Sequence, residues 1–337
     1  MSFKSIHGHE KQIRILQNIL QRNRLPHAYL FYGMEGIGKR TVAETFAKAI
    51  NCKAPKTSRQ GSDVDVDSCD NCPSCFKADR KNHPDMVTIR ADGQFIKVKE
   101  IRDIQEQMKF APLEGGKRII MIDNADRMNN ISANALLKTL EEPTRSNLLI
   151  LITASPHQLP ATILSRCQQV RFNPLHADQV AAFLQERRSM EPEQAYSIAC
   201  ACQGSIGRAL NMGEDSCLTV REEILNHLNA IDRVKEPLRF LSMINGFGQD
   251  REDMTDRLNM LMTGYRDALI LKETGDENGL INRQCVDRIS AVAHGLSGKD
   301  ILHNIKTIDW AMTAIDRNAN KQLTLEVMLF RLVRCRE

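Results

Sequence analysis

Residues 33–40 read Gly33-Met34-Glu35-Gly36-Ile37-Gly38-Lys39-Arg40 and stand between a short apolar run and a helical pattern. The run before them, 28–32 (AYLFY), predicts a buried parallel strand. The segment after them, 41–51, has apolar residues at helical spacing. A glycine-rich loop in this setting is typical of a P-loop, whose backbone N–H groups surround a phosphate. The alternative is a glycine turn with a surface lysine. The predicted nucleotide-binding residues are Gly33, Gly36, Gly38, Lys39 and Thr41.

The residue after the P-loop lysine argues against catalysis. A working P-loop has Ser or Thr there, because that hydroxyl binds Mg²⁺. Arg40 occupies the position, and Thr41 lies one residue further, about 100 degrees around the helix. We therefore expect binding of ATP and magnesium to be weak or absent.

Further apolar runs predict a parallel sheet. Strands are expected at 86–90, 119–122, 148–152 and 169–172, and a helix at 132–142. Strands that alternate with helices imply a five-stranded parallel sheet with helices on both faces. A polar stretch, 53–68, is expected to be an exposed loop.

A second acidic motif follows the run 119–122. Asp123 ends this predicted strand, so its carboxylate should lie at the edge of the sheet beside the P-loop. The alternative is a carboxylate that only caps the strand. Asn124 follows, and a neutral amide cannot accept a proton from water as a carboxylate does.

Three cysteines within seven residues predict a metal site. Cys69, Cys72 and Cys75 have the spacing of zinc ligands, and zinc takes four ligands in a tetrahedron. Cys52 is the expected fourth ligand, with His83 as its competitor. We expect structural zinc; packing or free thiols are the alternative.

Strand patterns cease after Pro174. Short helices are expected at 178–188, 193–202 and 205–212, and longer ones such as 254–272 and 300–317 further on. The predicted domains are an α/β domain at 1–173 with an inserted zinc module at 52–75, a small helical lid at 174–215, and an all-α collar at 216–337.

Composition excludes several classes of protein. The net charge of +4 permits contact with nucleic acid but does not by itself indicate it. An aromatic content of 5% counts against a platform on which bases stack. The chain shows no signal peptide or apolar run long enough for a membrane span. We expect a cytoplasmic protein without membrane contact.

Three segments resemble the clamp-loader family of AAA+ proteins in bacterial DNA polymerase III. They are 25–31 (LPHAYLF), 134–143 (NALLKTLEEP) and 164–167 (LSRC), and together with the P-loop and acidic motif they follow the family order. The cysteine cluster is similar to the zinc module of that family. Lys39-Arg40 and 123–126 (DNAD) most resemble its non-motor subunit type.

The resemblance implies roles for three more residues. Arg166 would be an arginine finger that reaches the ATP site of an adjacent motor subunit, and an ordinary surface or salt-bridged arginine is the alternative. Thr153 and Arg208 match positions that sense nucleotide, although both could be structural. The implied partners are the gamma/tau and delta subunits in a heteropentamer, the sliding clamp, and primed DNA through its phosphates.

The implied function is that of a stator-like subunit without ATPase activity of its own. The rival is an active AAA+ ATPase, the gamma/tau-type motor, against which Arg40 and Asn124 count. A stand-alone DNA-binding protein or P-loop kinase would leave the segment 164–167 unexplained.

Overall fold

The computed structural model describes residues 2–22, 24–60, 63–91, 95–202, 204–211, 244, 247, 251–277, 280, 282, 285–316 and 319–334. The chain forms two compact units. One comprises Met1–Gln179 and Gly204–Gly207, and the other comprises Val180–Gln203 and Arg208–Glu337. The first contains the sheet, and the second is helical in its described residues.

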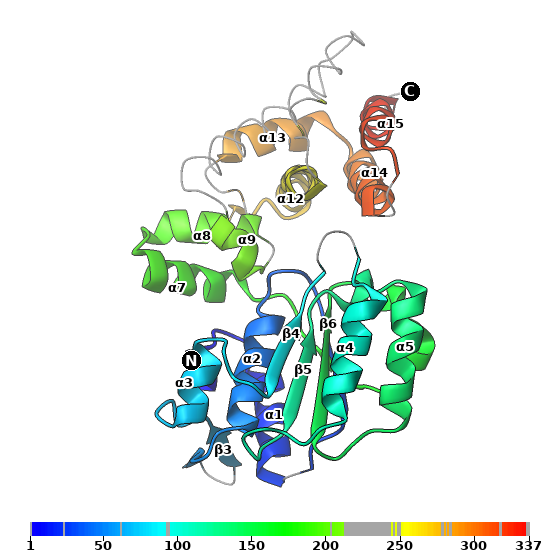
Figure 1. Ribbon diagram of the computed structural model, residues 1–337. Helices are drawn as coiled ribbons and strands as arrows, with labels where there is room; N and C mark the ends of the chain where they lie inside the picture. Colours follow the sequence, from blue (N-terminus) through cyan, green and yellow to red (C-terminus); the bar gives the residue numbers. More distant parts are fainter. Residues whose placement is uncertain are drawn as a thin grey trace. The chain divides into compact units, whose positions relative to one another are not determined.

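The first unit is built on a parallel sheet of five strands in the order β4-β5-β6-β1-β7 (Figure 1). The strands are β1 Ala28–Tyr32, β4 Met86–Ile89, β5 Arg118–Ile122, β6 Asn147–Thr153 and β7 Gln168–Arg171. Tyr32 pairs with Thr153 on one side and Arg171 on the other. The predicted five-stranded sheet is confirmed. Because its strands are parallel, the segments that follow β1, β5 and β6 meet at one edge.

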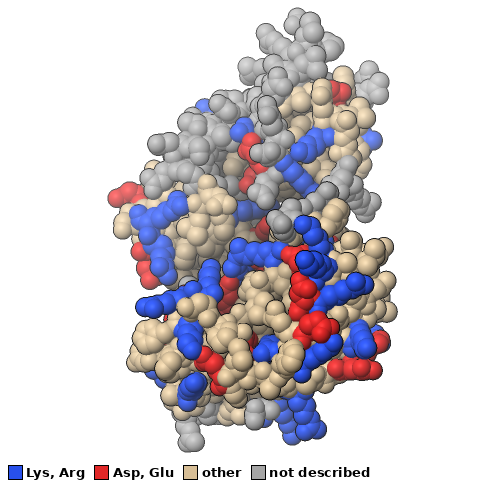
Figure 2. Space-filling view, viewed as in Figure 1, with Lys and Arg blue, Asp and Glu red and all other residues tan. Residues whose placement is uncertain are grey.

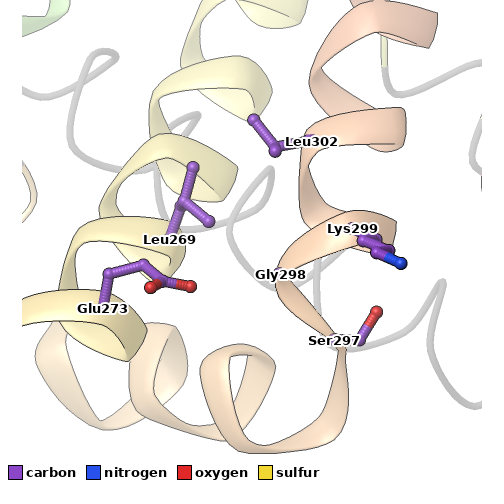
Figure 3. A pocket seen from close by; sticks show the side chains of 6 residues that line it. All are labelled: Leu269, Glu273, Ser297, Gly298, Lys299 and Leu302. Carbon is purple, nitrogen blue, oxygen red and sulfur yellow. The ribbon is translucent and has the colours of Figure 1, made fainter.

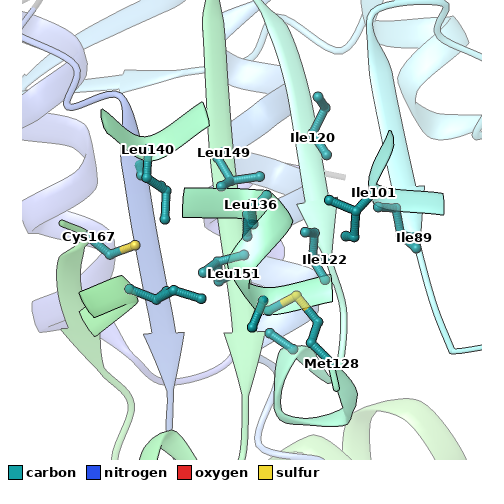
Figure 4. Packing of buried hydrophobic residues seen from close by; sticks show 14 of the residues in the cluster. Ile89, Ile101, Ile120, Ile122, Met128, Leu136, Leu140, Leu149, Leu151 and Cys167 are labelled. Atoms are coloured by element: carbon teal, nitrogen blue, oxygen red, sulfur yellow. The ribbon is translucent and has the colours of Figure 1, made fainter. Parts of the chain in front are cut away.

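Helices cover both faces of this sheet, since successive side chains of a buried strand point to opposite faces. On one face, α4 (Val98–Met108) and α5 (Asn130–Glu141) bring Ile101 and Leu136 onto Ile120 and Leu149 (Figure 4). The other face packs against α1 (Glu10–Arg22) and α2 (Lys39–Ile50), where Phe46 joins Tyr29 and Phe31. The short elements of this unit are η1 Phe3–Ser5, α3 Pro73–Asp79, η2 Ala125–Arg127, η3 Pro156–Gln158 and α6 Ala161–Leu164.

The segment 53–68, predicted to be an exposed loop, contains a β-hairpin. β2 (Lys56–Gln60) and β3 (Asp63–Asp67) pair antiparallel, and β3 packs beside α1. Val66, Asp67 and Ser68 are buried, and the backbone N–H of Phe3 donates to Asp67 Oδ1 at 3.1 Å. The prediction was wrong because the hairpin is stabilised by contacts with the N-terminal segment, which its polar composition does not reveal. Its alternation of Asp and Val at 63–67 is nevertheless a strand pattern.

The helices after the sheet are α7 Ala177–Arg188, α8 Pro192–Ala201, α9 Ile206–Asn211, α12 Arg251–Thr274, α13 Val286–Gly295, α14 Gly298–Asp316 and α15 Lys321–Arg334. The helices predicted at 178–188, 193–202, 205–212, 254–272 and 300–317 coincide with α7, α8, α9, α12 and α14. α12 packs against α13 and α14, and α14 against α15. The boundary predicted near 215 lies outside the described residues, so the division into lid and collar stays a prediction.

A hollow of about 540 Å³ lies between the second half of α12 and the start of α14 (Figure 3). Its lining is Leu269, Glu273, Ser297, Gly298, Lys299 and Leu302. Ser297 caps α14: its Oγ accepts from the N–H of Asp300 at 3.2 Å and donates to Asp300 Oδ2 at 2.5 Å. Among the described helices, none is long and apolar enough to cross a membrane.

Candidate functional site

The glycine loop after β1 adopts backbone conformations that favour glycine. Gly33 and Gly38 have φ angles of +149° and +100°, a range that other residues rarely adopt. A side chain at Gly33 would also collide with the backbone, because its Cβ would lie 2.3 Å from the carbonyl oxygen of Phe172. The sequence pattern therefore corresponds to a steric requirement at these positions.

All carbonyl oxygens of residues 33–37 accept hydrogen bonds from within the unit. Lys39 Nζ donates to those of Gly33 and Met34, each at 2.7 Å. The carbonyl of residue 35 accepts from Ser205 Oγ at 2.9 Å, that of residue 36 from the N–H of Gly207 at 2.8 Å, and that of residue 37 from His9 Nε2 at 2.6 Å. The backbone N–H groups of residues 34–38, by contrast, donate to no partner among the described residues. The loop is thus held with its donors available, which is the arrangement that binds an anion.

Lys39 is the buried cation of this loop, with 7% of its surface exposed. Burial lowers the pKa of its ammonium to about 8, although Glu35, Asp123 and Asp126 act in the opposite direction. His9, which braces the same loop, has its pKa lowered by burial. Lys39 therefore carries its charge at neutral pH and loses it in mildly alkaline solution.

Arg40 lies against the carboxylate that ends β5. Its Nη1 is 3.7 Å from Asp123 Oδ2, and its Nε donates to Glu44 Oε1 at 2.7 Å. A second guanidinium approaches the same oxygen, with Arg90 Nε at 3.6 Å. Asp123 therefore lies beside the P-loop, as predicted, and forms ion pairs with two arginines.

Three further residues follow or border the strands at this edge. Thr153 is fully buried, and its hydroxyl donates to Asp126 and accepts from the N–H of Ser155 at 2.9 Å. Thr41 is half-buried in the first turn of α2. Asn124 adopts a left-handed conformation with φ of +53° and precedes η2.

Arg166 follows α6 on the surface of the same unit. Its Nη2 donates to Glu141 Oε1 at 2.8 Å, and its Nη1 to the carbonyl oxygen of Thr162 at 2.9 Å. The next residue, Cys167, belongs to the core, and burial raises the pKa of its thiol to about 12. The buried cysteine fixes the segment while the arginine remains 36% exposed.

Arg208, the other predicted sensor, belongs to the second unit. It lies on α9, and its Nη1 is 3.3 Å from Asp256 Oδ1 on α12. Its proposed contact with nucleotide stays a prediction.

The four predicted cysteines form one cluster. The sulfur atoms of Cys52, Cys69, Cys72 and Cys75 all lie within 4.8 Å of one another. Backbone N–H groups donate to three of them: Cys69 N to Cys52 Sγ at 3.3 Å, Cys72 N to Cys69 Sγ at 3.2 Å, and Cys75 N to Cys72 Sγ at 3.4 Å. Such donors favour thiolates: although burial acts in the opposite direction, they lower the pKa of Cys72 to about 6. At Cys52 and Cys75 burial outweighs the donors and raises the pKa of the thiol. Four thiolates at this separation can hold a metal ion of the zinc type.

His83 does not join this cluster. Its Nε2 is 3.0 Å from Ser74 Oγ, and its Nδ1 accepts from the N–H of Asp85 at 3.1 Å. Both ring nitrogens are thus engaged within the protein. Of the two candidates for the fourth position, the structure places Cys52 with the other thiols.

Sequence reasoning missed a buried lysine that links α2 to the cysteine loop. Lys48 is 3% exposed, and its Nζ lies 2.5 Å from Asp70 Oδ1 and 2.6 Å from Asp79 Oδ2. His9, Ser205, Arg90 and Glu141 were missed as well. Their roles depend on contacts between distant segments, for which the sequence carries no local signal.

Comparisons with known proteins agree with these features. The family model described as "DNA polymerase III, delta subunit" matches residues 8–176, and "DNA polymerase III, delta subunit, C terminal" matches residues 217–334. The chain belongs to the DNA polymerase III delta subunit family. This confirms the family that the motifs at 25–31, 134–143 and 164–167 predict.

Two curated relatives define the likeness further. The DNA polymerase III subunit delta' of Bacillus subtilis is 29% identical over 323 residues, which is 95% of this chain and 94% of the relative. The tau subunit of Escherichia coli is 33% identical over 220 residues, 64% of this chain but 33% of the relative. Among solved structures, a gamma subunit-related protein of Thermotoga maritima has 18% identity and a TM-score of 0.42, with 96% of this chain and 99% of that one covered.

Proposed function

We propose that the chain is the non-motor, stator-like subunit of a DNA polymerase III clamp loader, the role of a delta-prime subunit. The observation that carries this is Arg40. Arg40 takes the sequence position of the P-loop hydroxyl that binds Mg²⁺, and its guanidinium contacts Asp123, the carboxylate that would help to hold that ion. With Asn124 in place of a carboxylate, the site lacks a group that accepts a proton from water. The chain accordingly has no ATPase activity of its own.

The proposed catalytic contribution is made in trans by Arg166. A guanidinium stays protonated and binds two oxygens at once, which suits it to the charge that develops on a transferred phosphoryl group. The contact with Glu141 holds the arginine at the surface of the free chain, and the buried Cys167 anchors the adjoining backbone. We propose that Arg166 enters the ATP site of a neighbouring gamma/tau subunit.

The proposed partners are gamma/tau and delta subunits, the sliding clamp, and primed DNA through its phosphates. The matches to delta' and tau support association with the other clamp-loader subunits. On the face shown in Figure 2, Lys and Arg side chains of the described residues are interspersed with Asp and Glu. On this face, the mixed charge favours DNA contacts made by an assembly over contacts made by a basic patch of this chain alone.

We further propose that Cys52, Cys69, Cys72 and Cys75 hold a structural zinc ion. A closed set of four thiolates leaves no position for substrate, so the ion would stabilise the loop 52–75 and take no part in catalysis.

The experiment that tests the proposed function is ATP turnover by a reconstituted complex. It contains gamma/tau and delta subunits, the clamp, primed DNA, and this chain as wild type, Arg166→Ala or Lys39→Ala. The stator proposal expects a large loss with Arg166→Ala and little change with Lys39→Ala. An equal loss with Lys39→Ala would favour the rival, a gamma/tau-type motor.

A further inference from the structure

The environment of Asp123 is unsuitable for a divalent cation. Arg40 and Arg90 both approach its Oδ2, at 3.7 and 3.6 Å. A magnesium ion held by this carboxylate would stand beside two guanidinium groups, whose positive charges repel it. Mg²⁺ also keeps a near-ideal octahedral shell, which two guanidinium groups would obstruct.

The rest of the loop is nevertheless arranged for a phosphate. The carbonyl oxygens of residues 33–37 accept bonds from Lys39, Ser205, Gly207 and His9. The N–H groups of residues 34–38 donate to no described partner. These five donors, the ammonium of Lys39 and the start of α2 form one anion-binding surface.

We propose that this surface binds the polyphosphate of a nucleoside di- or triphosphate without a metal ion, with Arg40 in the place of Mg²⁺. The inference rests on the P-loop predicted from the sequence and identifies the chemical form of the nucleotide that this loop binds. Arg40 and Arg90 lie against Asp123, Arg40 also pairs with Glu44, and Lys39 adds a third positive charge at the loop. A guanidinium can bridge two phosphate oxygens in the way a metal ion bridges them, and it requires no hydroxyl at position 40.

The same arrangement explains why the nucleotide would bind without being hydrolysed. An arginine provides charge and hydrogen bonds but cannot activate water as a metal ion does. The nucleotide would therefore remain intact and act as a structural ligand between the loop and α2.

The test is equilibrium binding of ATP and of ADP to the purified full chain, with either EDTA or excess Mg²⁺ present. For the wild type, we expect the affinity in EDTA to equal or exceed that in Mg²⁺. Arg40→Ala should weaken binding in EDTA by about tenfold, the effect of losing about 1.4 kcal/mol. Arg40→Thr restores the hydroxyl and removes the repulsion, so its binding should become stronger in Mg²⁺ than in EDTA. Lys39→Ala should abolish binding, and Arg80→Ala, at an exposed position after α3, serves as the matched control.

Two outcomes would overturn the inference. One is wild-type binding that Mg²⁺ strengthens tenfold or more. The other is no binding of ATP or ADP in either condition by wild-type chain whose circular dichroism is that of a folded protein. Neither outcome affects the stator proposal, since that depends on the Arg166→Ala result in the assembled complex.

Discussion

Lys48→Met should destabilise the first unit and loosen the cysteine loop. The ammonium is 3% exposed and lies 2.5 Å from Asp70 and 2.6 Å from Asp79. Methionine retains the unbranched shape of the buried stem, so the variant removes the charge with little change in packing. Two aspartates would then lose their buried cation.

The expected loss follows from these contacts. Each hydrogen bond to a charged group contributes about 1.5–3 kcal/mol. Because the carboxylates are 36% and 38% exposed, water compensates part of this loss. We expect the free energy of unfolding to fall by about 2–3 kcal/mol, which lowers Tm by about 4–12 °C for a unit of this size.

The assay is chemical or thermal unfolding followed by circular dichroism, with Lys11→Met on the exposed side of α1 as control. The control should stay within about 0.5 kcal/mol of the wild type. Although burial acts against it, the Lys48 ammonium lowers the pKa of Asp70 below its ordinary value of 3.8. The stabilisation is therefore present above that pH and is lost as pH falls through the lower pKa of the folded state, so the two proteins should converge in acid. Equal stability of Lys48→Met and Lys11→Met at pH 7 would refute the reasoning.

Two further predictions concern the metal site and the P-loop. Purified protein should carry one zinc ion by elemental analysis and Cys72→Ser should carry none, whereas Cys200→Ser should retain it; untreated wild-type protein without zinc would contradict the proposal. Affinity for ATP in EDTA should fall as pH rises through about 8, because Lys39, whose pKa burial lowers to that value, loses its charge there. A flat affinity between pH 7 and about pH 9 would show that the ammonium contributes nothing to binding.

The parallel strands were the most predictable part of the fold. Runs such as 119–122 and 148–152 are apolar throughout because both faces of the sheet are covered, and they coincide with β5 and β6 to within a residue at each end. The hairpin at 56–67 was missed, since its burial comes from η1 and α1 and not from apolar strands of its own. The predicted elements also omit α1 and α4, although Leu16 and Ile101 belong to apolar faces at helical spacing.

In the candidate site, too, the residues at fixed spacing were predictable from the sequence, whereas the contacts between distant segments were not. Residue types at fixed spacing, such as the glycines at 33, 36 and 38 or the cysteines at 69, 72 and 75, were readable because their chemistry depends on local geometry. Arg90 on Asp123, Glu141 on Arg166 and Lys48 on Asp70 join segments that are far apart in the chain. No spacing encodes such pairs, so only the structure reveals them.

Turnover by the reconstituted clamp loader with Arg166→Ala tests the central claim most directly. The arginine is paired with Glu141 at the surface, so its removal should change the stability of the chain by less than about 1 kcal/mol. An arginine finger contributes about 10³–10⁵ in kcat at the site it serves. The account predicts that Arg166→Ala removes at least the part of DNA-dependent turnover that the neighbouring subunit's ATP site supplies. Turnover should stay at the wild-type level with Arg80→Ala and Lys39→Ala. Wild-type turnover by a complex that has incorporated Arg166→Ala would contradict it.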